Sequence, residues 1–421
     1  MREKLDVLRE PDFRRLFLGR TTSLIGDGIA PIALAFAVLD LTGSATDLGI
    51  VLAVHSLTIT ALVLAGGVFA DRISPRRAML WADVTRTAST GAVAALLLAG
   101  VAEIWELALL YAITGAATAL FNPASNAIVP QIVPGRRLQE ANALLTFSRW
   151  AGKSVGPALA GVLLALGSPG TALAADAATF AVSAACLWGV RAPGVRSEEE
   201  GEPFLAELRH GWKEFSSRSW MVAIILSAAI SNAIFFPIFQ VLGPTVAKES
   251  LGGSSSWALI AALWGIGGLL GGIVAIGVRP RRPLLVSEGF VALIALPVFA
   301  LAVPASTAVI ATAALLAGGT VSLAEILYET TAAQYIPPES LSRVIAYDWF
   351  GSLALEPLTL ALIGPLAAGI GISTTLWLGA LAMTLCQLCV LLVPSVRHLE
   401  ARPDATGLRA MPPPRPLEAG D

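Results

Sequence analysis

Long apolar runs separated by short polar links constrain the fold of this chain more than any other feature of its sequence. Each run has about 20 residues, the length that an α-helix needs to cross the hydrocarbon core of a bilayer. Segments of about ten residues with alternating polarity, which are typical of a transmembrane β-barrel, are not seen. The sequence therefore predicts an all-α polytopic membrane protein with twelve transmembrane helices. The runs cover roughly 16–39, 47–70, 78–100, 104–129, 139–166, 170–190, 220–246, 255–278, 283–303, 306–335, 341–369 and 373–394.

Composition and charge narrow the functions that such a chain could have. It is 55% hydrophobic and only 14% charged, whereas a soluble domain carries roughly 25% charged residues. Its net charge of -2 gives no general attraction to nucleic acid. The three cysteines lie in apolar runs and the three histidines lie far apart, so we expect no disulfide framework, metal site or catalytic cluster. We therefore expect a protein that is not an enzyme, has no cofactor, and acts as a monomer in the lipid bilayer on a small-molecule substrate.

An internal repeat divides the apolar runs into two sets of six. The stretch 66–77 has a copy at 271–282, in which a glycine pair, a proline and an arginine pair recur without a gap. A repeat at this distance indicates that one structural unit was used twice. Two six-helix halves repeated in parallel are the plan of a rocker-type secondary transporter.

The predicted domain boundaries follow from this repeat. Residues 1–190 form an N-terminal six-helix bundle, and residues 220–397 form a C-terminal six-helix bundle. The linker 191–219 has apolar residues at helical spacing, which fits either an amphipathic helix on the membrane surface or a solvated helix packed on the loops. The segment 398–421 is rich in proline and charge, so we expect a disordered cytoplasmic tail.

The distribution of basic residues predicts the orientation in the membrane. If the N-terminus is cytoplasmic, nearly all of the 28 lysines and arginines fall on the cytoplasmic side. Lys248 is the exception on the opposite side, and Arg20, Arg86, Arg149 and Lys153 lie inside the apolar runs. Because cytoplasmic loops are enriched in basic residues, we expect a protein of the inner (cytoplasmic) membrane with both termini in the cytoplasm.

Two motifs in the N-terminal half resemble signatures of a known family. The pattern Gly67-x-x-x-Asp71-Arg72-x-x-x-Arg76-Arg77 resembles the loop between helices two and three of the major facilitator superfamily. In the fifth run, Gly152-x-x-x-Gly156-Pro157-x-x-x-Gly161 is similar to the antiporter signature of drug exporters in that superfamily. Over most of its length the chain is similar to the twelve-helix group that includes macrolide-efflux proteins and the enterobactin exporter.

The resemblance implies roles for both motifs and an energy source. It implies drug:proton antiport driven by the proton gradient. Glycines one turn apart permit close helix contact, and a proline inside a helix removes one backbone hydrogen bond. The implied hinge of helix five consists of Gly152, Gly156, Pro157 and Gly161. The implied cytoplasmic gating loop consists of Gly67, Asp71, Arg72, Arg76 and Arg77.

Ionisable residues inside the apolar runs are costly to insert and are usually functional. Burial of a carboxylate in a medium of low dielectric favours its protonated form, which is the physical basis for proton coupling. The alternative is that these charges pair with one another and only hold helices together. We expect this structural role for Asp83, Arg86 and Asp176, which lie nearer the ends of their runs. The candidates for proton coupling or for binding a substrate charge are Asp27, Arg149, Lys153, Glu325, Glu329 and Glu356.

Aromatic and amide side chains in helices four, seven and ten are candidates for the wall of a substrate cavity. Such a wall suits a mostly apolar ligand with a few polar anchors, although each residue could equally serve ordinary helix packing. The candidates are Tyr111, Asn122, Asn126, Asn232, Phe235, Phe236, Phe239, Gln240 and Tyr328. Together these features predict a transporter that exports a small, mostly hydrophobic compound by proton antiport. A proton-coupled uptake symporter, or a non-transporting membrane receptor, is the alternative.

Overall fold

The computed structural model describes residues 2–72, 74–192, 212, 215–303, 305–336, 344, 347–348 and 350–401, with side chains from residue 6 onward except 63–72. Within these ranges all regular structure is helical and no strand occurs. The predicted all-α membrane fold is confirmed. Most of the predicted linker helix and the predicted tail after residue 401 lie outside the described residues.

The described part of the N-terminal half has six long helices and three short ones. Proline in the first turn, where a missing N–H does no harm, begins three of them, and glycine at φ 66° and 69° ends α1 and α3 at Gly43 and Gly100. The long helices are α1 (Pro11–Thr42), α2 (Ala45–Arg72), α3 (Pro75–Ala99), α4 (Ile104–Ala127), α6 (Leu138–Leu166) and α7 (Pro169–Trp188). The short ones are η1 (Arg2–Arg9), α5 (Val129–Ile132) and η2 (Gly135–Arg137).

The C-terminal half repeats this plan, but some of its spans are interrupted. Its first span runs through α9 (Ser219–Pro237), the π-helical turn η3 (Ile238–Leu242) and α10 (Gly243–Ser250). Its third span runs through α12 (Pro283–Val291), η4 (Ala292–Ala295) and α13 (Leu296–Ala302). The other elements are α11 (Ser254–Ala275), α14 (Thr307–Tyr335), α16 (Glu356–Ile370), α17 (Ile372–Leu391) and α18 (Pro394–Arg397).

Prolines explain these interruptions. A proline lacks the N–H of the helical ladder and disfavours helical geometry in the residue before it. The turn η3 follows Pro237, η4 ends just before Pro297, and α16 begins next to Pro357. The sequence analysis placed Glu356 midway along an unbroken eleventh helix, and this placement is wrong. Glu356 is the first residue of α16, after a turn at residues 354–355.

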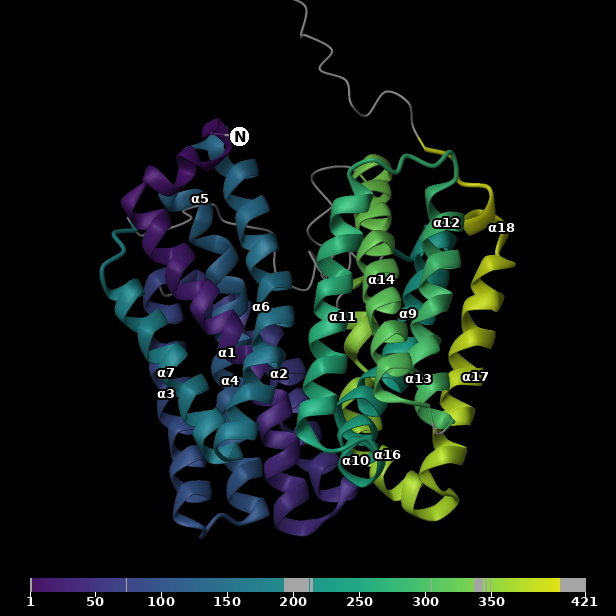
Figure 1. The fold of residues 1–421 in the computed structure, drawn as a ribbon. Helices are drawn as coiled ribbons and strands as arrows, with labels where there is room; N and C mark the ends of the chain where they lie inside the picture. The colour runs from purple at the N-terminus through teal and green to yellow at the C-terminus, as the bar shows by residue number, and fades with distance from the viewer. Residues whose placement is uncertain are drawn as a thin grey trace, which may run out of the picture.

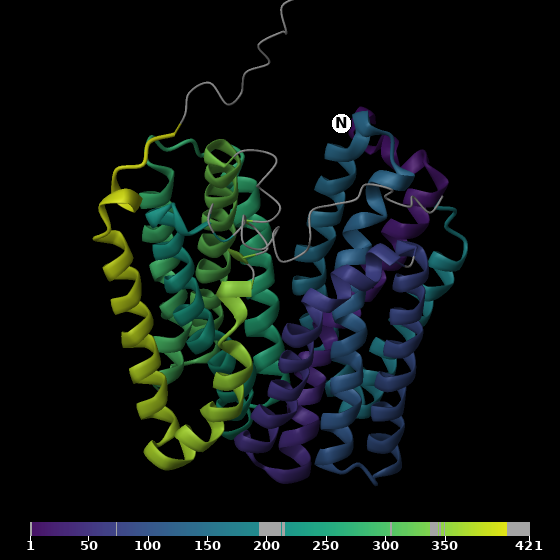
Figure 2. The same cartoon turned by 180° about the vertical axis from the view of Figure 1, so that it is seen from behind.

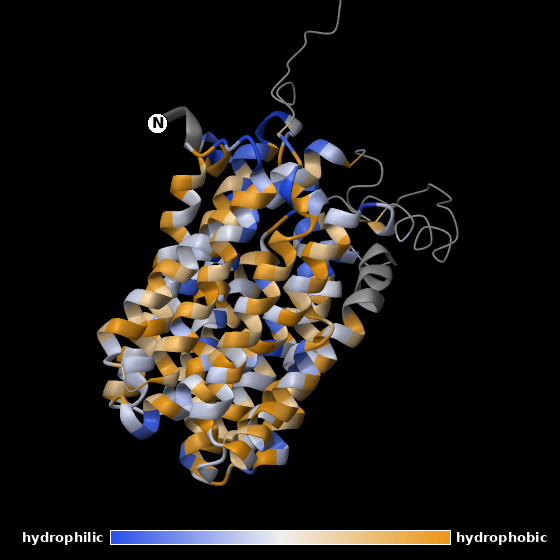
Figure 3. Ribbon diagram, turned by 90° about the vertical axis from the view of Figure 1, so that its right-hand side faces the viewer, coloured by the Kyte–Doolittle hydropathy of each residue, from blue (hydrophilic) through white to orange (hydrophobic). Residues whose placement is uncertain are grey.

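The described helices include ten spans that are long and apolar enough to cross a membrane. Two further helices have the length but are more polar, namely α3 with 25 residues and α6 with 29. Both carry charges within the span: Asp83 and Arg86 in α3, and Arg149 and Lys153 in α6. With α3 and α6, the described part of the chain has six spans in each half. Figure 3 shows apolar residues along the sides of the bundle and polar residues gathered towards its ends.

The two halves stand side by side and meet mainly at one end of the molecule. Figure 1 shows the N-terminus and α18 together at the top, which we call the termini end, and the opposite end we call the far end. The two sets of ribbons approach each other at the far end and diverge towards the termini end, in both views (Figures 1 and 2). The contacts between halves are dominated by α6 with α11 and by α2 with α16.

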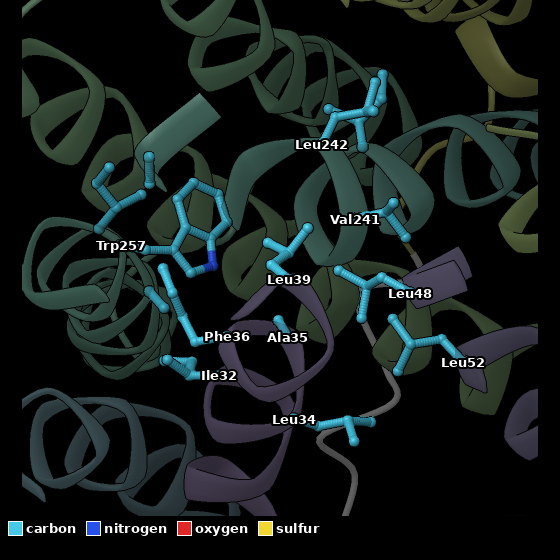
Figure 4. Packing of buried hydrophobic residues seen from close by; sticks show 14 of the residues in the cluster. Ile32, Leu34, Ala35, Phe36, Leu39, Leu48, Leu52, Val241, Leu242 and Trp257 are labelled. Atoms are coloured by element: carbon cyan, nitrogen blue, oxygen red, sulfur yellow. The ribbon is translucent and has the colours of Figure 1, made fainter. Parts of the chain in front are cut away.

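The hydrophobic cores explain this arrangement. One large core joins both halves at the far end, where α1 and α2 pack against η3, α10, α11 and α16 (Figure 4). In it Leu39 and Leu48 of the N-terminal half lie near Val241, Leu242 and Trp257 of the C-terminal half. At the termini end each half has its own separate core. A shared core at one end and separate cores at the other define a state that is sealed at the far end.

Candidate transport pathway

The far-end seal combines a polar contact with close backbone packing. Lys248, in α10, lies 2.6 Å from a carboxylate oxygen of Asp40 in α1 and donates a hydrogen bond of 2.6 Å to the carbonyl of Leu39. These groups come from opposite halves. Lys248 was the one basic residue that the sequence analysis assigned to the outer side of the membrane, and its partner on the other half gives that position a structural role.

Glycines allow the backbones of the two halves to touch beside this contact. A methyl group added at Gly49 of α2 would overlap the carbonyl oxygen of Leu360 in α16. One added at Gly364 of α16 would overlap the backbone of Thr46 in α2. These contacts need the absence of a side chain, so they hold α2 and α16 at a distance that no other residue permits.

The predicted hinge in α6 makes two different kinds of contact. Gly152 and Gly156 pack against α1 in the same half, where added methyl groups would overlap the carbonyls of Leu24 and Ile25. Gly161 instead faces Ala258 in α11 of the other half. The helix stays continuous through Pro157 from Leu138 to Leu166. The hinge role therefore stays a prediction, and the packing role of the glycines is visible.

Helix α11 approaches α6 in the same glycine-dependent manner. Methyl groups added at Gly265 and Gly268 would overlap the backbone of Lys153 and the ring of Trp150, both in α6. On its other side, Gly267 and Gly271 lie against backbone atoms of α14. Gly271 belongs to the repeated motif that the sequence analysis identified, and its closest neighbours are in α14.

A charged cluster lies inside the N-terminal half, between α1, α3, α4 and α7. The buried guanidinium of Arg86 in α3 pairs with Asp83 one turn away and lies 3.8 Å from Asp27 in α1. Its Cζ atom lies 4.2 Å and 4.3 Å from the ring centres of Phe121 and Phe180. The cation thus contacts both aromatic rings as well as both carboxylates.

This cluster continues into α7. A side chain at Gly26 of α1 would overlap Asp176 and Thr179, so α1 lies directly on them. Asp83 and Asp176 are buried, and each has a carboxylate oxygen without a hydrogen-bond partner within the described part of the chain. Asp27 differs, because its side chain is 44% exposed. The sequence analysis separated Asp27 from Asp83, Arg86 and Asp176, and the structure brings all four together.

Charged residues of opposite sign lie on α6 of one half and on α14 of the other. Arg149 and Lys153 in α6 are exposed, and so are Glu325 and Glu329 in α14. The negative charge of Glu325 acts on Lys153, and the positive charge of Arg149 acts on Glu329. None of these four forms an ion pair within 4.0 Å among the described residues.

Glu356 does not take part in this set. The sequence analysis named Glu356 of helix eleven as a candidate together with the cations of helix five, and these helices hold matching positions in the two halves. In the structure the oxygen Oε1 of Glu356 accepts a long hydrogen bond, 3.5 Å, from Gln240 of its own half. The carboxylates that act on the α6 cations are those of α14.

The predicted cavity residues divide into buried and accessible ones. Tyr111 and Phe235 are buried; Tyr111 packs on His55 and Phe235 stacks on Trp264, at centre distances of 5.4 Å and 4.8 Å. Phe236 and Phe239 belong to the same aromatic group around Phe235. Asn232 donates to the carbonyl of Ser352, and Tyr328 donates to Asp348, each at 3.2 Å. Asn122 and Asn126 are exposed.

Only part of the predicted gating loop is described with its side chains. Arg76 donates hydrogen bonds to the carbonyls of Leu187, at 3.0 Å, and Trp188, which are the last residues of α7. A cation at this position satisfies free carbonyls at a helix C-terminus. Arg77 is exposed; the surroundings of Gly67 and the side chains of Asp71 and Arg72 lie outside the description.

The fold and these groups define a multi-pass membrane protein built of two helical bundles that carry charged and amide side chains within their spans. The Major Facilitator Superfamily model matches residues 16–354. The chain belongs to the major facilitator superfamily.

Two of the relatives to which the chain is similar are named as efflux proteins. The chain is 26% identical over 399 residues to the multidrug efflux pump Tap of Mycolicibacterium fortuitum, covering 90% of this chain and 95% of that protein. It is 24% identical over 280 residues to macrolide efflux protein A of Streptococcus pyogenes, covering 65% of this chain and 69% of that protein.

Solved structures of transporters share the fold. A mutant of the nucleoside transporter NupG has a TM-score of 0.75 at 11% identity, over 90% of this chain and 98% of that one. A bacterial homologue of the lysosomal transporter Spinster, in an inward-facing and unoccupied conformation, has a TM-score of 0.71 at 16% identity, over 91% and 96%.

Proposed function

We propose that this protein exports a small, mostly hydrophobic compound from the cytoplasm by alternating access, in exchange for protons. The observation that carries the proposal is the similarity to the efflux pump Tap over nearly the whole length of both chains. The state with a sealed far end fits the loading step of an exporter, if the termini end faces the cytoplasm as the basic residues predict.

Alternating access in this proposal exchanges one seal for another. The Lys248–Asp40 contact and the glycine contacts of α2 with α16 must open before the far end can release a substrate. At the termini end, Arg149 and Lys153 would then move closer to Glu325 and Glu329 as the halves close. Opposite charges that approach in a medium of low dielectric attract more strongly, which favours that closure.

Proton coupling in this proposal rests on Asp27. It is the accessible member of the cluster around Arg86, whereas Asp83 is fully buried. A proton taken up by Asp27 removes its attraction to Arg86 and leaves the guanidinium to Asp83 and the aromatic rings. Because α1 and α3 are joined through this contact, the protonation state of Asp27 changes the interaction between two helices of the same bundle. A ligand shifts a conformational equilibrium only through such a difference between states.

An accumulation assay tests the exporter itself. Cells with and without the protein are loaded with a panel of fluorescent dyes and antibiotics, in the presence or absence of a protonophore. The proposal expects lower accumulation of some compounds in producing cells and loss of that difference with the protonophore. Higher accumulation in producing cells would indicate uptake, and equal accumulation across a broad panel would contradict the exporter proposal.

A further inference from the structure

A small polar pocket in the N-terminal half includes Arg149, which takes part in the proposed closure, and several residues that no earlier step uses. It has a volume of about 270 Å³ and lies at the termini end, between α1, the end of α4 with α5, and the first turns of α6. Two arginines line it from different helices, Arg20 of α1 and Arg149 of α6. Its other lining residues are Asn126, Val129, Asn142, Leu145 and Thr146.

The two arginines have no acidic partner in the part of the chain that the structure describes. Among the described residues neither Arg20 nor Arg149 forms an ion pair. Arg20 is only 8% exposed, and its guanidinium donates one long hydrogen bond, 3.5 Å, to the carbonyl of Ser125. Arg149 donates to the hydroxyl of Thr146 at 3.2 Å. Most of the donors of both guanidinium groups are therefore free to bind a ligand.

The charges near the pocket do not balance within it. The positive charge of Arg149 acts on Arg20. The negative charge of Asp27, which lies deeper along α1, also acts on Arg20. The charge of Arg149 also interacts with that of Glu329, which lies in α14 of the other half. Two like charges that face one polar pocket repel each other, and an anion between them would remove this repulsion. Guanidinium groups also match carboxylate and phosphate oxygens in geometry.

We propose that this pocket binds the anionic group, a carboxylate or a phosphate, of the transported compound. The inference rests on the proposed export function and specifies its substrate class. The pocket is smaller than the roughly 300–1,000 Å³ typical of sites for whole drug-sized molecules, so it holds one charged group and the apolar remainder of the substrate lies outside it. Asn126 and Asn142 supply further donors to the same group.

A matched pair of fluorescent probes tests this assignment without requiring transport. Anthracene-9-carboxylate and anthracene-9-carboxamide share one ring system and differ in charge. Each is titrated into the purified full-length protein in dodecyl maltoside, a detergent without phosphate, and binding is followed by anisotropy. The carboxylate should bind at least tenfold more tightly than the uncharged amide. Equal affinities would overturn the proposal.

Substitutions locate the binding site. Arg149→Gln, at an exposed position, should weaken carboxylate binding by about 10- to 100-fold, which corresponds to the loss of a charge-assisted hydrogen bond, and should leave amide binding unchanged. Arg20→Lys keeps the buried charge but loses the planar guanidinium group, which can donate two parallel hydrogen bonds. This substitution should therefore also weaken binding of the carboxylate probe. Arg136→Gln is the matched control, because Arg136 is exposed just before α6 and outside the pocket. If Arg136→Gln weakens binding as much as Arg149→Gln, the effect comes from the overall positive charge of this end of the protein, and the pocket is not the binding site.

A lipid headgroup could offer the same chemistry. Phosphatidylglycerol added to the micelles should not displace the carboxylate probe at equimolar concentration if the pocket serves the substrate. Displacement at that concentration would assign the pocket to lipid and overturn the proposal. Because these titrations measure binding alone, they can succeed even if the efflux assay fails, and the two proposals can be judged separately.

Discussion

Arg86 of α3 lies 3.8 Å from Asp27 of α1 while it remains paired with Asp83 of its own helix. One cation is thus shared between a carboxylate that is 44% exposed and one that is fully buried. Such a shared cation can respond to a proton on the accessible carboxylate without losing its last partner. This relationship distinguishes Asp27 from the other acidic residues of the N-terminal half.

Asp27→Asn should abolish proton-driven efflux while leaving the protein in the membrane. The amide keeps the size of the side chain but cannot release a proton, so the difference between the two protonation states disappears. The measurement is dye efflux from energised vesicles after a pH jump, with expression checked by immunoblot. Asp47→Asn, at the start of α2, is the control carboxylate and should transport normally. Full pH-driven efflux by Asp27→Asn would remove Asp27 from the coupling mechanism.

Arg86→Gln should lower the free energy of unfolding by about 3–5 kcal/mol, the range for removing one partner of a buried ion pair. The substitution leaves Asp83 charged and fully buried, and removes the cation from between Phe121 and Phe180. Thermal denaturation in detergent measures the effect. The double variant Asp83→Asn with Arg86→Gln should recover much of the loss, because no unpaired charge remains. Arg77→Gln, exposed in the same helix, should change little.

Gly364→Ala should shift the equilibrium away from the state in which the far end is closed. The added methyl group would overlap the backbone of Thr46 in the other half, and overpacking typically costs 1–3 kcal/mol, a shift of roughly 5- to 150-fold in the equilibrium between states. Gly369→Ala is a matched control in the same helix, since a methyl group there meets no atom within 4 Å.

Cysteine labelling reports this shift. The three native cysteines, Cys186, Cys386 and Cys389, are first replaced by serine, and Phe36→Cys then places a thiol in the core that joins the halves. A membrane-impermeant maleimide should label this thiol faster in the Gly364→Ala background than in the Gly369→Ala background. Identical labelling rates would mean that the contact of α2 with α16 does not control the far end.

Lys248→Met should have a smaller effect in the same direction. The ion pair with Asp40 is partly exposed, with side chains 36% and 55% accessible, and exposed pairs contribute only about 0.2–1 kcal/mol. We expect at most about a fivefold increase in the labelling rate of the Phe36→Cys reporter. A larger change, equal to that of Gly364→Ala, would show that this pair is the main element of the seal.

The sequence predicts the number and length of the helices well but predicts their contacts poorly. Apolar runs of bilayer length mark the spans. Even α3 and α6, which carry several charges, were predicted as spans because their other residues are mostly apolar. The interruption before Glu356 was missed because Pro357 was treated as a residue within a helix and not as its beginning. The interruptions at η3 and η4 could likewise be predicted only by knowing which backbone groups find hydrogen-bond partners outside the regular helical pattern.

The candidate site was only partly predictable, because membrane helices are apolar on nearly every side and their sequence gives little sign of which face meets which neighbour. Asp27 was recognised as an intramembrane carboxylate, but its partner Arg86 was assigned a separate structural role near the end of its own run. The pairing depends on the rotation of α3 about its axis, which the sequence does not report. Arg149 and Lys153 were recognised, but the carboxylates that act on them lie in α14 and not in helix eleven.

Helix α11 has glycines on two sides, Gly265 and Gly268 towards α6 and Gly267 and Gly271 towards α14. At these positions α11 lies against both neighbours without a side chain of its own in between. A helix of this kind can slide along its neighbours without lifting away from them, and sliding breaks few contacts at once. The barrier between the two states should then come from the residues at the ends of the pathway, so that α11 guides the motion and the seals set its rate.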